Sequence, residues 1–225
     1  MKNFITLIIG FLTFFTFSCS KNLTEDEKFW NMSKEKMGKI VRDMSTSELL
    51  QKCLSYPYWY TSGPYSTPGT AFGVAMSETP VFSEFFSRYD SSTELLKVYK
   101  KMDPLAVDHN WTGLEKGRFA TRIQKVEYLI IVMIDILDAS DLRNLKEEVI
   151  SKYQKKKSLL GSGIFWESDL SYTVGVCVNI IEKVNSELLD GRRLEVNYFK
   201  FYLMVDSTNL QFLDDMIELL KSIEI

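Results

Sequence analysis

The sequence has little of what most catalytic and metal centres require. It contains one histidine, His109, and nucleophilic or general-base catalysis usually sets a histidine beside a serine, cysteine or aspartate. It also lacks the His-Glu-x-x-His and paired Cys-x-x-Cys motifs of zinc sites, and the acidic, glycine-containing loop of calcium sites. We therefore expect a structural role for His109, no bound metal, no cofactor and, on balance, no enzymatic activity.

Cysteine is also scarce, with three residues in the chain: Cys19, Cys53 and Cys177. If Cys19 serves as a lipid anchor, as argued below, the remaining two are too few for the disulfide framework of a small secreted scaffold. A bridge between Cys53 and Cys177 is one interpretation. The sequence favours the other, in which both are buried thiols on apolar helix faces.

No excess of positive charge marks a nucleic-acid surface. The chain has 27 basic and 30 acidic residues, a net charge of −3 and a pI near 5.4. The basic residues are scattered, whereas a nucleic-acid-binding protein shows a basic patch or stripe. We expect the run of lysines at 155–157 to lie at the end of a helix, where cations suit the helix dipole; a patch for lipid headgroups is the alternative.

What the sequence does have is a targeting signal at its N-terminus. Lys2 precedes an apolar run from Phe4 to Phe17, which is shorter than the about 20 apolar residues of a bilayer-spanning helix. The pattern is that of a secretory signal peptide, here residues 1–18. Cys19 then stands at the first mature position, which resembles a bacterial lipoprotein box, although Thr16 replaces the usual aliphatic residue. We predict lipidation at Cys19 and a bacterial cell-envelope location in the outer membrane, on its periplasmic or its surface face.

After the signal peptide we expect a short lipidated tether, residues 19–26, and one domain, residues 27–225. The tether is polar and acidic with no apolar period. The full chain is 45% hydrophobic and 13% aromatic, and a domain of this length has ample apolar residues for a single core.

Helix signals recur along the domain. Ser45 with Glu48 forms a capping box, Ser91 with Glu94 repeats it, and Pro80 after Thr79 suits a first helical position. Helical periodicity predicts further helices over 118–137, from Ser140 to Lys157, over 168–189 and after Asp206-Ser207, with another segment at 194–205. Strands at 129–137 and near 172–178 are the minor alternatives. The prediction is an all-α fold of about seven to eight helices, arranged as an irregular helical-hairpin array, which we slightly prefer, or as a helical bundle.

Part of the domain resembles a known group of proteins. Residues 44–50 read Met-Ser-Thr-Ser-Glu-Leu-Leu and are followed by Cys53-Leu54 and Tyr56-Pro57, and later by Arg88-Tyr89-Asp90. This order resembles a group of uncharacterised predicted lipoproteins of Bacteroidetes, in which a Met-Thr-Thr-like cap, a Cys-Leu pair and a Tyr-Pro pair precede helical segments. The match covers about a third of the mature chain, which departs from it by a longer loop at 61–70. The resemblance implies a helical envelope protein and no particular activity.

One stretch, residues 56–69, packs five aromatic residues among three prolines and two glycines. Aromatic rings with polar tips give a large contact area at low entropic cost, so an exposed loop of this kind suits binding of a glycan or a protein. The candidate binding residues are Tyr58, Trp59, Tyr60 and Tyr65. The sequence favours the plainer interpretation, in which the loop folds back and its rings fill gaps between helices.

A second short motif, Asp206-Ser207-Thr208, resembles the O-glycosylation acceptor of exported Bacteroidetes proteins, with Ser207 as the acceptor. A helix cap by Asp206 or Ser207 is the simpler interpretation.

The functional prediction is a lipid-anchored, non-catalytic binding or scaffold subunit of the cell envelope. Its partners would be the membrane and a glycan or envelope protein, with no nucleic acid. The alternative is a carboxylate-based hydrolase of envelope or dietary polymer, since catalytic acids converge only in three dimensions. A structural spacer is the third possibility. The carboxylate pairs at 147–148 and 214–215 and the Ser33-x-x-Lys36 match are interpreted as ordinary charged helix faces.

Overall fold

The computed structural model describes residues 24–57, 79–108, 110–187 and 210–225. Within these ranges the protein consists of nine α-helices and one 3₁₀ turn, with no strand and only an isolated bridge between Leu160 and Phe165. The predicted all-α class is confirmed.

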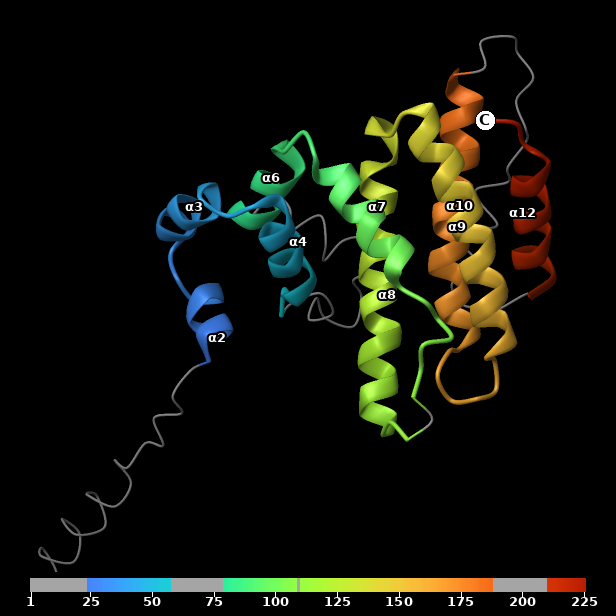
Figure 1. Ribbon diagram of the computed structural model, residues 1–225, viewed down its shortest axis with the longest axis horizontal. Helices are drawn as coiled ribbons and strands as arrows, with labels where there is room; N and C mark the ends of the chain where they lie inside the picture. Colours follow the sequence, from blue (N-terminus) through green and yellow to red (C-terminus); the bar gives the residue numbers. More distant parts are fainter. Residues whose placement is uncertain (1–23, 58–78, 109, 188–209) are drawn as a thin grey trace, which may run out of the picture.

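Four short helices form the N-terminal part of the described chain. They are α2 (Glu25–Trp30), α3 (Lys34–Arg42), α4 (Thr46–Ser55) and α6 (Pro80–Ser87). Helix α6 contacts both α3 and α4, and α4 in turn contacts α7 (Ser91–Lys101), which joins this part to the rest. Figure 1 shows these short helices beside one flank of the long ones.

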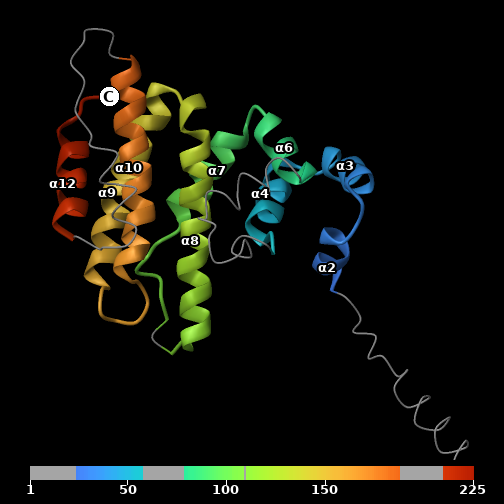
Figure 2. The same ribbon diagram turned by 180° about the vertical axis from the view of Figure 1, so that it is seen from behind.

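The long helices make a bundle. They are α8 (Gly113–Met133), which continues into the 3₁₀ turn η1 (Ile134–Ile136), then α9 (Ala139–Ser158), α10 (Glu167–Glu187) and α12 (Leu210–Ser222). Their axes run nearly parallel or antiparallel in Figures 1 and 2. Helix α10 lies at the centre and contacts α8, α9 and α12. The bundle alternative describes this half better than the hairpin array.

The core has one large and one small part. The large cluster includes residues from each of the described α-helices, and it buries the apolar stretch of α8 that includes Leu129, Ile130 and Met133. A smaller group, here called the end cluster, consists of Val107, Ala120, Ile123, Ile164 and Phe165. It lies where α8 begins and α9 passes to α10, which we call the lower end after its place in Figure 1.

The two described cysteines are buried thiols that form no disulfide. Cys53 on α4 and Cys177 on α10 form no bridge. Burial raises the pKa of the Cys53 thiol well above its usual range and that of Cys177 to about 12. The buried-thiol interpretation was therefore correct and the disulfide interpretation wrong.

Several helix starts agree with the sequence. Ser45 accepts a hydrogen bond from the Glu48 N–H and the Glu48 side chain accepts one from the Ser45 N–H, so the capping box forms. Pro80 occupies the first turn of α6 as predicted. The segments 129–133 and 172–178 are α-helical, which excludes the strand alternatives there.

Other helix starts differ from the predictions. Helix α2 begins at Glu25, inside the predicted tether, because Thr24 and Glu27 form a capping box. Asp90, not Ser91, precedes α7, and no side chain caps it. Asp138, not Ser140, caps α9 by accepting the Asp141 N–H at 2.8 Å. The predicted segment at 194–205 and the cap at 206–207 lie outside the described residues.

Among the described residues, no helix combines the length and the apolar character that crossing a bilayer requires.

Candidate functional site

The most unusual chemistry in the described chain is an ion pair inside the bundle. Glu127 on α8 and Lys156 on α9 are both 0% exposed. The Lys156 Nζ lies 2.9 Å from Glu127 Oε1 and 2.8 Å from Oε2. Moving two charges out of water is costly unless they are paired and their remaining hydrogen bonds are made. The surroundings of this pair supply those bonds.

Two hydroxyl groups complete the network. Thr173 on α10 accepts a hydrogen bond from the Lys156 ammonium at 2.9 Å and donates one to Glu127 Oε1 at 2.8 Å. The Tyr99 hydroxyl on α7 donates to the same carboxylate oxygen at 3.2 Å. The network therefore ties together side chains from α7, α8, α9 and α10.

A second layer surrounds the pair. The Lys152 ammonium lies 4.6 Å from the centre of the Tyr99 ring and 3.0 Å from a Glu148 carboxylate oxygen. Burial lowers the pKa of Lys152, an effect that Glu148 partly offsets. Burial, with Glu127 nearby, raises the pKa of Tyr99 well above its usual range, which keeps the hydroxyl a donor. Asp169 on α10 accepts hydrogen bonds from Gln124 and from the Trp166 backbone N–H.

This arrangement stabilises the helix packing and offers little to a substrate. The Lys156 ammonium is engaged by Glu127 and Thr173, and the carboxylate accepts hydrogen bonds from Lys156, Thr173 and Tyr99. Both charged groups are fully buried. We interpret the site as a polar core that fixes how four helices meet.

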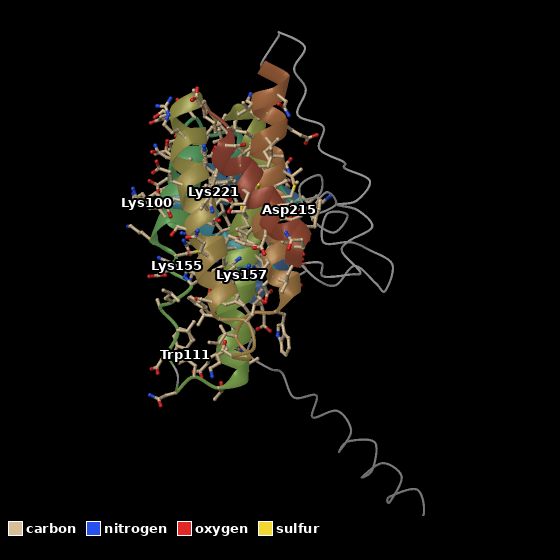
Figure 3. All side chains as sticks on the ribbon, turned by 90° about the vertical axis from the view of Figure 1, so that its right-hand side faces the viewer. Lys100, Trp111, Lys155, Lys157, Asp215 and Lys221 are labelled. Atoms are coloured by element: carbon tan, nitrogen blue, oxygen red, sulfur yellow. The ribbon has the colours of Figure 1, made fainter. Side chains whose placement is uncertain are left out.

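The three consecutive lysines of α9 have three separate partners. Lys155 pairs with Asp103 at 3.1 Å, Lys156 with Glu127, and Lys157 with Asp214 on α12 at 2.6 Å. They do lie in the last turn of the helix, as predicted, but their side chains link α9 to other elements. Figure 3 shows Lys155 at the flank of the molecule where Lys100 of α7 also lies, and Lys157 nearer to α12.

The paired carboxylates do not converge on a shared site. Glu148 bonds to Lys152 and its neighbour Glu147 is exposed. Asp214 accepts hydrogen bonds from Lys157 and from the Tyr153 hydroxyl, and Asp215 is exposed.

Ser33 of the Ser-x-x-Lys match is a helix cap. Its side chain accepts the Lys36 backbone N–H at 3.4 Å, at the start of α3. Its spacing to Lys36 is thus explained by local helix geometry.

The residues predicted for lipidation, binding and glycosylation lie outside the described part of the chain. These are Cys19, Tyr58, Trp59, Tyr60, Tyr65 and Ser207, together with the single histidine, His109. In the described ranges no group of three or more histidine, cysteine, aspartate and glutamate side chains is placed to hold a metal ion.

The sequence interpretation missed the polar core, although one signal was available. Glu127 interrupts the otherwise apolar run from Val126 to Ile134, and a carboxylate buried in such a helix needs a cation. Which lysine supplies it depends on how α8 and α9 pack.

Comparison of the chain with protein-family models, curated proteins and solved structures finds no match.

Proposed function

We propose that the protein is a lipid-anchored protein of the bacterial cell envelope that acts without catalysis, as a binding or scaffold subunit for a glycan or protein partner. The observation that carries this proposal is the N-terminal pattern of Lys2, the apolar run and Cys19. A cysteine directly after a signal-peptide pattern has a specific use as the acyl acceptor, and stable anchoring needs two or more lipid signals.

The described helices support a non-catalytic role in one respect. The carboxylate of Glu127 and the ammonium of Lys156 are fully buried and form an ion pair with each other. Glu148 pairs with Lys152 one turn further along α9, and Asp214 of α12 pairs with Lys157 of α9.

Mass spectrometry of the intact mature chain tests the anchor. We expect a chain that begins at Cys19 and carries acyl mass, and a Cys19→Ser variant that lacks this mass and no longer fractionates with membranes. A wild-type chain without acyl mass would overturn the proposal. The same spectrum reports on Ser207, since a glycan there adds mass that a Ser207→Ala variant loses.

Purification of the lipidated protein from detergent-solubilised envelopes tests the scaffold role. We expect a stoichiometric protein or glycan partner to copurify. Recovery of the lipidated protein alone would contradict this role and would favour a screen for hydrolase substrates.

The aromatic loop is the candidate contact for such a partner. Replacing Trp59 by alanine should reduce partner recovery without changing the thermal unfolding midpoint. Tyr89, which is 98% exposed and lies outside the loop, provides the matched control as Tyr89→Ala. Equal recovery with both variants would remove the loop from the proposal.

A further inference from the structure

Three large apolar side chains are open to solvent at the lower end of the bundle. Leu105, Leu114 and Trp166 are 50%, 64% and 68% exposed. Leu105 lies between α7 and α8, Leu114 lies in the first turn of α8, and Trp166 directly precedes α10. Figure 1 shows that the segment leading to α8 and the loop between α9 and α10 reach the same end of the bundle.

The backbone that carries these side chains is held by the end cluster. Phe119 of α8 packs against Trp111 at 5.5 Å and against Phe165 at 6.4 Å between ring centres. Figure 3 places Trp111 at this end of the molecule. Two of the exposed residues have packed neighbours, since Trp166 directly follows the buried Phe165 and Leu114 lies five residues before Phe119, which packs against the end cluster.

Helix α2, the first described helix, begins on the same side of the molecule as α8 does. The first turn of α2 points toward the lower side in Figures 1 and 2, as the start of α8 does. Helix α2 is fixed to α4 by an ion pair between Asp26 and Lys52 and by Lys52 lying 4.7 Å from the Phe29 ring centre. Cys19 precedes Glu25 by six residues, which span at most about 20 Å.

We propose that the lower end of the bundle rests on the bilayer to which the protein is anchored, with Trp166, Leu114 and Leu105 entering the lipid interface. The inference rests on the lipid anchor of the proposed function. Tryptophan is enriched at membrane interfaces because its ring is apolar while its N–H is polar. Interfacial elements bury their apolar side chains by about 5–10 Å at the boundary between headgroups and acyl chains.

The small number of exposed apolar side chains at this end favours a membrane over a second copy of the chain. A stable protein interface buries about 1,200–2,000 Å² in total, more than three side chains on two loops and a helix start supply. An anchored domain needs much less buried area to contact the membrane, because the tether holds it at a high effective concentration near the surface.

The charges at this end define the kind of contact. The exposed residues Asp103, Asp108, Glu115 and Arg118 lie close to Leu105 or Leu114 in the sequence and include both signs of charge. The contact is therefore apolar, and it should form equally on zwitterionic and on anionic vesicles, unlike a polybasic patch.

Quenching of tryptophan emission by brominated lipids tests the proposal. The full lipidated chain is reconstituted in vesicles of phosphatidylethanolamine and phosphatidylglycerol, with either ordinary or brominated acyl chains. Wild type should lose a larger fraction of its emission in brominated vesicles than Trp166→Phe does, and the difference between the two should be blue-shifted. Phosphatidylcholine vesicles should give the same difference.

A matched control moves the reporter to the opposite end. Ile136 is 63% exposed and follows the end of α8, which is about 30 Å from its start. In the Trp166→Phe background, Ile136→Trp should add emission that brominated lipid leaves unquenched.

The outcomes separate this inference from the proposed function. Equal quenching of wild type and Trp166→Phe, in protein whose intact mass shows acyl chains, would overturn the membrane contact and leave the anchor in place. Protein without acyl mass would overturn both. Quenching of Ile136→Trp as strong as that of Trp166 would also overturn the proposed orientation.

Discussion

The pair of Glu127 and Lys156 concentrates much of the specificity of the bundle in two side chains. A buried pair gains little over well-packed apolar residues, but removing one partner leaves an uncompensated charge. Tyr99 of α7 and Thr173 of α10 bond to the same carboxylate as Lys156 does. A shift of α7, α8, α9 or α10 therefore disturbs the network.

We predict that Lys156→Met destabilises the fold by about 3–5 kcal/mol, because Glu127 then remains buried without its cation. Lys157→Met is the matched control from the next position, where the pair with Asp214 is partly exposed and is worth about 0–1 kcal/mol. Urea unfolding measures both. A double variant, Lys156→Met with Glu127→Gln, should recover part of the loss. Equal effects of the two lysine substitutions would contradict the role assigned to the pair.

Lys125 makes the free energy of unfolding depend on pH, with a sign that follows from its lowered pKa. Burial lowers its pKa from 10.5 to about 8, while its ammonium group donates to the Leu54 carbonyl oxygen at 2.9 Å. Between these two pH values the unfolded lysine binds a proton that the folded lysine has lost. The free energy of unfolding should therefore rise with pH across this window.

The Lys125→Met variant isolates this effect. Denaturant unfolding at pH 7.5 to 10.5, in which the wild-type value is compared with the variant value at each pH, should give a difference that changes in favour of wild type as pH rises. A constant difference would show that burial does not shift this lysine.

At the scale of elements, the ends of the helices depend on local hydrogen bonds that short motifs encode unequally well. Ser45 with Glu48 and Thr112 with Glu115 form reciprocal capping boxes. In contrast, Ser91 lies inside α7 and its hydroxyl donates to the Arg88 carbonyl oxygen. The choice of cap depends on where the preceding chain turns, and a motif of four residues does not contain that information.

The start of α9 allows a direct comparison of two adjacent candidates. Asp138→Ala should cost about 1 kcal/mol because the Asp141 N–H loses its acceptor. Ser140→Ala should change stability by less than about 0.5 kcal/mol, as exposed substitutions away from such features do. Thermal or urea unfolding of the two variants checks the order, and the reverse order would restore the prediction made from the sequence.

The same limit explains which parts of the site the sequence could reveal. Apolar periodicity identified α8, α10 and α12 because the residues of the buried face recur at helical spacing in each of them. The identical residues Lys155, Lys156 and Lys157 could not be told apart, because their partners come from other segments of the chain. The patch at the lower end was equally hidden, since Leu105, Leu114 and Trp166 are separated in sequence.

For the molecule as a whole, the two buried thiols make stability independent of redox conditions. We predict no change of the thermal unfolding midpoint on addition of a reducing agent, because Cys53 and Cys177 form no bridge. A thiol reagent should find no reactive cysteine in the native lipidated protein. After denaturation it should find two, because acylation blocks Cys19.

A third reactive thiol after denaturation would show that Cys19 is unmodified. A midpoint that falls on reduction would instead show a bridge in the protein in solution.

The place of α12 in the chain has a consequence for synthesis. Its buried residues Leu213, Ile217 and Leu220 belong to a helix that packs against α10 and α9. A ribosome produces the chain from its N-terminus, so a nascent polypeptide that has emerged only through α10 still lacks these apolar contacts. Such a polypeptide remains a client for chaperones until α12 emerges. For a chain that is exported, as proposed here, this delay favours the unfolded form that a secretion channel can thread.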